Sequence, residues 1–274
     1  MAVSVAGTGM KMQSGQRTGR KGISGSTLKM IAIVTMLIDH IGAAVLGRLL
    51  MTSGMMEAMA TEETIETWLS SHAALYMVYL VLRMIGRVAF PIFCFLMVEG
   101  FEHTGNRFRY AVRLGLFALV SEIPFDLAFK GTLLEFGYQN IFFTLFLGFL
   151  AMTVYYYIEE TQWNRILQVI LGVAEVVLFM GAAELLGTDY GARGVLCIMI
   201  LFAFRKNRRM QILAGCLAFF WWELPALAAF VIIAFYNGER GWKLKYFFYL
   251  FYPVHLLLLY LVCWFMGIGG ISAV

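Results

Sequence analysis

Apolar residues along this chain form long continuous blocks, separated by short polar or charged segments. Blocks of about 20 apolar residues can cross a bilayer as helices, whereas a membrane barrel requires alternating strands of about ten residues. The pattern therefore predicts an all-α polytopic membrane protein with about nine transmembrane helices in one bundle. Residues 205–245 also fit a single broken or re-entrant pair. The predicted spans are 28–50, 73–101, 110–129, 139–158, 166–186, 191–204, 210–222, 225–236 and 246–266.

The composition agrees with a membrane protein. The chain is 61% hydrophobic and 14% charged, against about 45–50% and about 25% in a typical soluble domain. The pattern shows no second domain or internal repeat, so residues 28–274 are predicted to form one transmembrane domain. The cysteines lie singly in apolar blocks without CxxC spacing, which predicts small core residues and no metal site. They are Cys94, Cys197, Cys216 and Cys263.

The charge distribution predicts an orientation. Residues 1–27 are polar, basic and rich in Gly and Ser, which is typical of a disordered cytoplasmic tail. The segment 51–72 is acidic and contains no Lys or Arg. The positive-inside rule places the N-terminus in the cytoplasm and this acidic loop outside.

Asp39 and His40 stand side by side in the middle of the first predicted span. A carboxylate near the bilayer centre costs about 2.5–3.5 kcal/mol on insertion scales, so such residues are functional candidates. His255 lies at a similar depth in the last span, and two such histidines could face one cavity. Histidine is suited to general base catalysis, and a carboxylate can orient it. Successive helical residues point about 100° apart, so Asp39 could instead pair with Arg83 or Arg87; all three polar residues could also serve helix packing alone.

Arg83 and Arg87 lie four residues apart, on one face of the second span. Because arginine keeps its charge, they must face a carboxylate, a phosphate or water. They could neutralise Asp39 or Glu99, or hold an anionic ligand. Pro91 is expected to bend this helix. The basic cluster 205–209 contacts anionic lipid headgroups or receives a polyphosphate ligand; its candidate ligand-binding residues are Arg205, Lys206 and Arg208.

Polar residues also gather near the outer ends of the third and fourth spans. Glu122 and Asp126 are four apart across Pro124, and Asn140 begins the next span. They could orient an incoming amine or hydroxyl, and a solvated helix end explains them equally well. No Gly-rich phosphate loop, HExxH motif or nucleophile elbow is present. The residues alone therefore predict an intramembrane polar site centred on histidine, and leave open an enzyme, a transporter of protons or small anions, and a scaffold.

Several blocks together resemble the TraX family of integral membrane proteins, which is named for the enzyme that acetylates the N-terminus of F-type conjugative pilin. The family is similar in plan to a wider group of transmembrane acyltransferases that includes the lysosomal heparan-sulfate acetyltransferases. The blocks follow the family's order from about residue 28 to the C-terminus. They are LKMIAIVTMLIDHIG from Leu28, RMIGRVAFPIFCFLMVEG from Arg83, SEIPFD from Ser121, QNIFFT from Gln139, DYG from Asp189 and FYPVH from Phe251.

The resemblance implies transfer of an acetyl group from cytosolic acetyl-CoA to a hydroxyl or amine acceptor at or across the membrane. It implies His40, Asp39 and His255 as catalytic residues, with His40 as general base; an acetyl-histidine intermediate stays open. The cofactor-binding candidates are then Arg87, Arg83, Glu99, Arg205, Lys206 and Arg208, and the acceptor-binding candidates are Glu122, Asp126, Asn140 and Tyr252.

The expected surroundings follow from the same resemblance. They are the lipid bilayer, a multi-pass position in the bacterial inner (cytoplasmic) membrane, acetyl-CoA, and an unidentified envelope, peptide or small-molecule acceptor. No nucleic acid partner is expected, and homo-oligomerisation stays open. The long basic tail and the acidic loop 51–72 depart from the family's simplest form. Nothing in the residues indicates a pilus, so pilin is not implied as the substrate.

Overall fold

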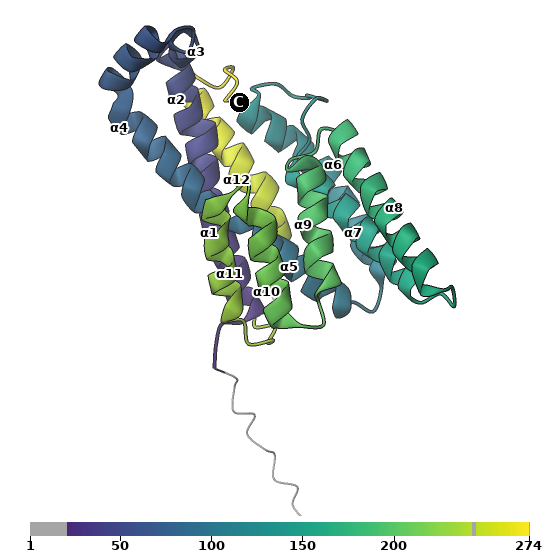
Figure 1. Ribbon diagram of the computed structural model, residues 1–274. Coiled ribbons are helices and arrows are strands. Elements are labelled where there is room, and N and C mark those ends of the chain that lie inside the picture. Colours follow the sequence, from purple (N-terminus) through teal and green to yellow (C-terminus); the bar gives the residue numbers. More distant parts are fainter. Residues whose placement is uncertain (1–20, 243–244, 274) are drawn as a thin grey trace, which may run out of the picture.

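The computed structural model describes residues 21–242 and 245–273, which form a bundle of helices joined by turns, without a β-strand in this part of the chain (Figure 1). The expected tail 1–27 falls largely outside the described residues, but α1 begins at Gly25, three residues earlier than predicted. The helices are α1 (Gly25–His40), α2 (Gly47–Thr52), α3 (Met55–Ala58), α4 (Glu62–Gly86), α5 (Ala89–Glu102), α6 (Arg107–Phe129), α7 (Ile141–Glu159), α8 (Arg165–Leu185), α9 (Gly191–Ala203), α10 (Arg208–Phe220), α11 (Leu227–Ala234) and α12 (Lys245–Phe265), with a π-helix η1 (Ile41–Leu46) and a 3-10 turn η2 (Leu224–Ala226).

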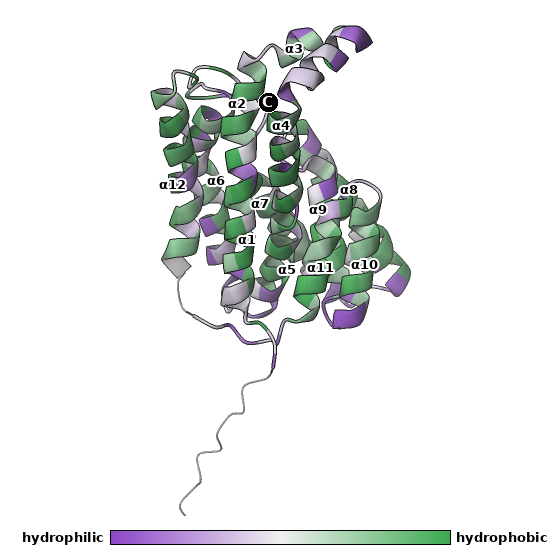
Figure 2. Ribbon diagram, turned by 90° about the vertical axis from the view of Figure 1, so that its left-hand side faces the viewer, coloured by the Kyte–Doolittle hydropathy of each residue, from purple (hydrophilic) through white to green (hydrophobic). Residues whose placement is uncertain are grey.

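Five helical segments are long and apolar enough to cross a membrane. The prediction of a helical membrane protein is therefore confirmed, and Figure 2 shows hydrophobic residues along the helices with hydrophilic ones gathered toward both ends. The count of nine spans is not supported, because α5, α9, α10 and α11 contain 14 residues or fewer, whereas a span needs about 20. The five segments are Gly25–Thr52, Glu62–Glu102, Ile141–Glu159, Arg165–Leu185 and Phe247–Phe265.

Short polar side chains cap the start of six of the twelve α-helices in the described chain. A Ser, Thr or Asn at the N-cap accepts a hydrogen bond from a backbone N–H that has no partner within the helix. Thr61 forms a reciprocal capping box with Thr64, so α4 begins within the acidic segment 51–72, eleven residues before the predicted second span. The other caps of this kind are Ser24, Asn106, Asn140, Asn164 and Asn207.

The second predicted span breaks into α4 and α5 around Arg87 and Val88. Pro91 lies in the first turn of α5, where its missing N–H costs nothing. Because a proline ring clashes with the carbonyl four residues earlier, the break falls at Arg87 and not at Pro91 itself. The predicted bend is thus a change of helix, which leaves Arg87 in a turn inside the bundle.

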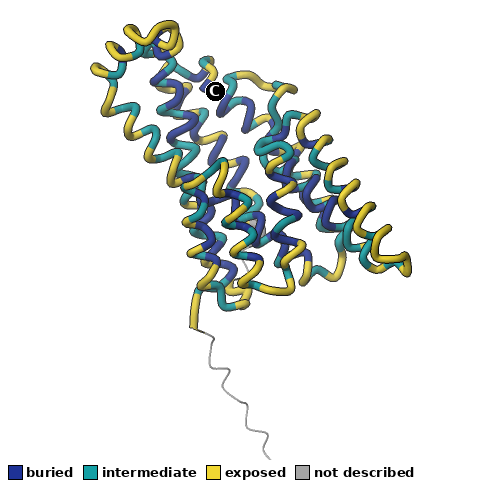
Figure 3. The backbone as a smooth tube through the Cα atoms, in the orientation of Figure 1, coloured by how far each residue is buried: buried dark blue, intermediate teal, exposed yellow. Residues whose placement is uncertain are grey.

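The helices differ in how far they extend between the two ends of the bundle. The end of the bundle at residues 21–24, here the tail end, also carries the turns 103–106, 160–164, 204–207 and 235–242 (Figure 1). The far end carries α3 and residues 266–273. The short helices α9, α10 and α11 start or finish at the tail end and reach only part of the way to the far end. The turns around Asp189 and Glu223 consequently lie within the bundle, whereas α8 is peripheral and largely exposed (Figure 3).

Arg48 is fully buried at the far end, where it holds three segments together. Its Nε donates to the Ile271 carbonyl at 2.7 Å and Nη2 donates to the Leu127 carbonyl at 2.9 Å. Nη1 donates to the carbonyls of Ala44 and Ala128. Carbonyls at a helix C-terminus, such as the end of α6, favour a cation. The guanidinium thereby connects η1, α6 and the C-terminal residues without a carboxylate partner among the described residues.

Replacing Arg48 with Met should lower the free energy of unfolding by about 3 kcal/mol, because several buried carbonyls lose their donor and each costs about 1–3 kcal/mol. Thermal unfolding of detergent-purified protein measures the change, with exposed Arg209→Met as the control. An Arg48→Met variant that melts at the wild-type temperature would show that these hydrogen bonds do not hold the C-terminal residues in place.

Candidate active site

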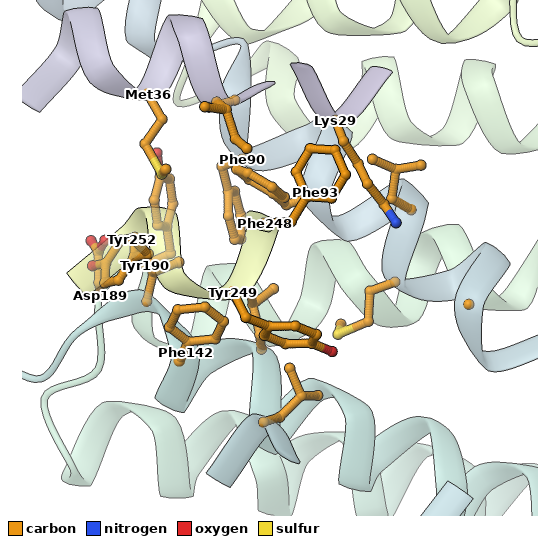
Figure 4. A pocket seen from close by; sticks show the side chains of 18 of the residues that line it. Lys29, Met36, Phe90, Phe93, Phe142, Asp189, Tyr190, Phe248, Tyr249 and Tyr252 are labelled. Atoms are coloured by element: carbon orange, nitrogen blue, oxygen red, sulfur yellow. The ribbon is translucent and has the colours of Figure 1, made fainter. Parts of the chain in front are cut away.

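A cavity of about 300 Å³ runs through the tail-side half of the bundle. Lys29 and Arg240 line one end, and His40 and Asp189 line the other. Lys29 and His40 are eleven residues apart on one helix, or about 16 Å at 1.5 Å per residue. Figure 4 shows Lys29 apart from Asp189 and Tyr190, with aromatic rings between them. The apolar wall includes Phe90, Phe93, Leu96, Met97, Leu114, Phe142, Leu145 and Phe248. We call this space the long cavity.

The tail-side mouth is fixed by backbone contacts between segments far apart in the sequence. Gly25 N donates to the Glu239 carbonyl at 2.8 Å, and Ser26 N donates to the Arg240 carbonyl at 3.0 Å. These bonds bring Arg240 beside Lys29, whose ammonium lies 5.3 Å from the centre of the Phe248 ring. The two cations interact repulsively. The mouth of an otherwise apolar cavity is therefore positively charged.

His40 and His255 meet at the deep end of the long cavity. His40 Nδ1 lies 2.7 Å from His255 Nε2, and the two ring planes are within 4° of parallel. His255 is buried, while Tyr252 on the same helix presents its ring edge-on to His40 at 6.0 Å. The structure thus brings together the two histidines singled out in the first and last predicted spans, together with Tyr252.

The hydrogen bonds assign the tautomers of both rings. His255 Nδ1 lies 2.7 Å from the Phe251 carbonyl, which only accepts, so Nδ1 carries the proton. In a neutral His255, Nε2 is then an acceptor, and His40 Nδ1 must donate to it. His40 Nε2 is left with its lone pair free at the cavity. A histidine oriented through its other nitrogen in this way is arranged as a base.

Asp39 lines the long cavity together with His40, but its carboxylate pairs with Arg83, whose Nη1 lies 2.6 Å from its Oδ2. The two side chains are 15% and 22% exposed. A Cβ at Gly86 would collide with Asp39, so the glycine lets α1 and α4 approach closely, as small residues do in membrane bundles. The π-helix η1 begins directly after His40; such segments recur at functional sites. Asp39 therefore secures α1 and does not orient the histidine.

Arg87 pairs with Glu223 across 3.1 Å, and not with Asp39 or Glu99. It also hydrogen bonds with Tyr190. Burial raises the pKa of Glu223 to about 7, although the Arg87 guanidinium opposes this rise. Neither Arg83 nor Arg87 lines the long cavity, so Arg87 reaches it only through Tyr190.

Asp189 lies in the turn before α9, at the deep end of the cavity. Its Oδ1 accepts a hydrogen bond from the Tyr138 hydroxyl at 2.8 Å, and its carbonyl accepts one from Thr144. Burial raises the pKa of the Asp189 carboxyl, while the Tyr138 hydrogen bond lowers it. The turn is thus tied to the start of α7 and presents a polar wall opposite the histidines.

The residues of the predicted cofactor cluster lie outside the long cavity. Arg205 pairs with Glu102 at 3.0 Å and Glu159 at 2.5 Å, and Arg208 pairs with Glu99 at 2.9 Å. These ion pairs connect the tail-side ends of α5, α7, α9 and α10. Lys206 is exposed at the same end, away from the cavity lining.

The predicted acceptor-binding residues Glu122, Asp126 and Asn140 form a buried cluster that does not line the long cavity. Asn140 donates to Glu122 and, at 2.8 Å, to the Ala118 carbonyl, while its Oδ1 caps α7. Asp126 Oδ2 accepts from Glu135 N at 2.8 Å. These hydrogen bonds stabilise the connection between α6 and α7, so the contacts that these three residues make are structural.

Lys29, Asp189, Tyr190 and Arg240 are among the cavity residues that were not predicted as site residues. Lys29 is visible in the sequence as a cation one residue inside the first predicted span. Tyr190 belongs to the DYG block. No signal distinguished Arg240 from other loop charges, because its place depends on the contact between residues 239–242 and the start of α1.

The chain matches known proteins over nearly all of the residues that the structure describes. The family described as "TraX protein" matches residues 24–263. The chain is 28% identical over 262 residues to the "Probable fimbrial assembly protein FimC, serogroup H1" of Dichelobacter nodosus, with 85% of this chain and 92% of the relative covered. No solved structure matches.

The Asp39–Arg83 pair should show strong energetic coupling. Asp39→Asn alone leaves a largely buried guanidinium unpaired and should destabilise the protein by about 3 kcal/mol. The double variant Asp39→Asn/Arg83→Gln should recover at least about 1 kcal/mol relative to the sum of the single variants. Thermal unfolding in detergent tests this, with Asp39→Asn/Arg87→Gln as the matched non-partner control. Additive effects in both double variants would contradict the pairing.

Proposed function

The chain belongs to the TraX family, and from that premise we propose that it is a membrane-embedded acetyltransferase that moves an acetyl group from acetyl-CoA to a hydroxyl or amine acceptor. The observation that carries the proposal is the long cavity that ends at His40, where the bond to His255 leaves Nε2 free. A base at the closed end of an apolar cavity suits a reaction from which water is excluded.

The cavity fits the chemistry of a coenzyme A thioester. Lys29 and Arg240 would hold the phosphates at the mouth, because clustered cations in a concave site attract polyanions. The apolar wall would hold the narrow pantetheine arm. Bound in this direction, the donor supplies an activated acetyl group at the His40 end. Since most of the lysines and arginines expected inside lie at the tail end, the donor would enter from the cytoplasm.

His40 acts as the general base in this proposal. Its Nε2 takes the proton from the acceptor hydroxyl or amine as the acceptor oxygen or nitrogen forms a bond to the acetyl carbon. The carbon–sulfur bond then breaks, and His40 returns the proton to the leaving thiolate. The acceptor gains the acetyl group and the donor leaves as a free thiol, so atoms and charge balance without another reactant.

His255 supports this step by position. Its Nε2 accepts a hydrogen bond from His40 Nδ1–H, and its own Nδ1–H donates a hydrogen bond to the Phe251 carbonyl. The hydrogen bond strengthens when His40 becomes positively charged, which stabilises the imidazolium as the carboxylate does in a Ser-His-Asp triad. Tyr252 fixes the orientation of both rings through edge-on contacts.

The relative from Dichelobacter nodosus is named for fimbrial assembly, and acetylation of pilin is associated with the family. A surface protein or peptide is therefore one acceptor compatible with the proposal. The chemistry of the site requires only a hydroxyl or amine that reaches His40 Nε2.

His40→Ala should lower acetyl transfer at least about 100-fold, because removal of a general base costs about 10²–10⁴ in rate. The assay follows thiol release from acetyl-CoA by detergent-purified protein with a host envelope fraction as the acceptor source. His255→Gln should cause a smaller loss, and both variants should bind acetyl-CoA within about twofold of wild type. Wild-type turnover in a folded His40→Ala variant would reject the proposed base.

Lys29→Gln and Arg240→Gln should each weaken acetyl-CoA binding about tenfold in calorimetric titration, through loss of one phosphate contact worth about 1.4 kcal/mol. Arg209→Gln, an exposed charge at the same end but outside the cavity, is the matched control. Equal weakening in all three would indicate general surface attraction. The absence of saturable binding by folded wild-type protein would reject acetyl-CoA as the donor and favour transport of protons or small anions.

A further inference from the structure

A second cavity, of about 480 Å³, adjoins the deep end of the long cavity. Its lining comes from the end of α8, the turn 186–190, the start of α9 and Trp222 after α10. These are the ends of the helices that face away from the tail end (Figure 1). The second cavity thus approaches the histidines from the side opposite the proposed entry of the donor.

Tyr190 lines both cavities and lies between them. Its ring stacks on Phe90 of the long cavity at 3.8 Å and contacts Trp222 of the second cavity edge-on at 5.9 Å. Its backbone has a φ of 65°, in the left-handed region that large side chains rarely adopt. Such a conformation persists only where surrounding contacts enforce it. One aromatic residue with a left-handed backbone therefore lies at the junction of the two cavities.

Thr188 provides an independent sign that the second cavity receives a ligand. The residue is 4% exposed and lines this cavity, yet its hydroxyl has no hydrogen-bond partner among the described residues. A buried hydroxyl without a hydrogen-bond partner carries a free-energy cost. A ligand with a polar group beside Thr188 would remove that cost.

The charges of the second cavity indicate the class of ligand. Arg193 lines it, is exposed, lies 5.8 Å from the centre of the Trp222 ring and forms no ion pair with the residues that the structure describes. Glu184 also lines it, but one carboxylate oxygen accepts the Ala192 N–H at 3.1 Å. The uncommitted cation favours an anionic group on the ligand.

We propose that the second cavity is the acceptor site. It takes an amine or hydroxyl compound that carries a nearby phosphate or carboxylate. Tyr190 separates this compound from the donor until the nucleophilic amine or hydroxyl of the compound reaches His40. The role as acceptor site rests on the proposed acetyl transfer, whereas binding of an anionic amine does not. Arg193 would pair with the anionic group of the compound, and the Thr188 hydroxyl would donate a hydrogen bond to that group. Trp222 would pack against the carbon skeleton of the compound.

The test uses phosphoethanolamine as the probe and follows line broadening of its ³¹P NMR signal by detergent-purified, CoA-saturated protein. Wild type should broaden the signal, β-alanine should reverse the broadening, and ethanolamine, which lacks the anion, should require at least a tenfold higher concentration to do so. Arg193→Gln should abolish the broadening. Arg209→Gln, an exposed charge that lines neither cavity, is the matched control and should retain it.

A second variant locates the probe. Thr188→Cys labelled with sodium (2-sulfonatoethyl) methanethiosulfonate places a sulfonate in the second cavity, so it should abolish probe binding and lower acetyl transfer at least tenfold. Its affinity for acetyl-CoA should stay within twofold of wild type; identically treated wild type controls for the native cysteines. Any of three results would overturn the proposal: no line broadening with wild type, broadening that persists in Arg193→Gln, or acetyl transfer that survives labelling of Thr188→Cys. Loss of acetyl-CoA binding in untreated wild type would instead reject the proposed transferase function and leave the probe result standing.

Discussion

The cost of placing charged groups among apolar helices is the constraint on which this structure depends. Charged groups within the bundle are stabilised by partners within the protein, because lipid offers neither water nor counterions. Asp39 meets Arg83, Arg87 meets Glu223, and Arg48 is surrounded by backbone carbonyls. These contacts connect helices that are distant in sequence, so satisfying the charges also sets the packing of α1, α4 and α6.

The short helices place polar turns beside the cavities. Because α9, α10 and α11 do not reach the far end, the turns around Asp189 and Glu223 lie inside the bundle. A turn can present backbone and polar side chains to a cavity where a continuous helix would present only one face. The two cavities meet at such a turn, at Tyr190. The histidine pair joins the last residue of α1 to α12 through a 2.7 Å hydrogen bond.

The sequence anticipated some contacts of the candidate site and missed others for identifiable reasons. Spacing indicated that Asp39 and His40 diverge by about 100°, and Asp39 does pair with Arg83. Depth alone suggested that His40 and His255 could face one cavity; the two rings do meet, at 2.7 Å, but His40 lines the long cavity and His255 lies behind it. In the basic cluster 205–209, the sequence shows the charge but not the Glu99, Glu102 and Glu159 side chains that pair with Arg205 and Arg208. Glu122 and Asn140 were correctly identified as unusual, but their polarity serves a helix connection.

The sequence by itself determined the helical membrane class, most helix boundaries and the presence of histidines at the depth of a buried site, since these follow from local periodicity, capping residues and the cost of burial. Only the tertiary structure decided which polar groups pair, which helices stop within the bundle, and that Lys29 and Arg240 form one mouth. Those features depend on contacts between segments up to 223 residues apart. Local sequence patterns specify the faces of helices, and the partner of each face is settled only when the whole bundle packs.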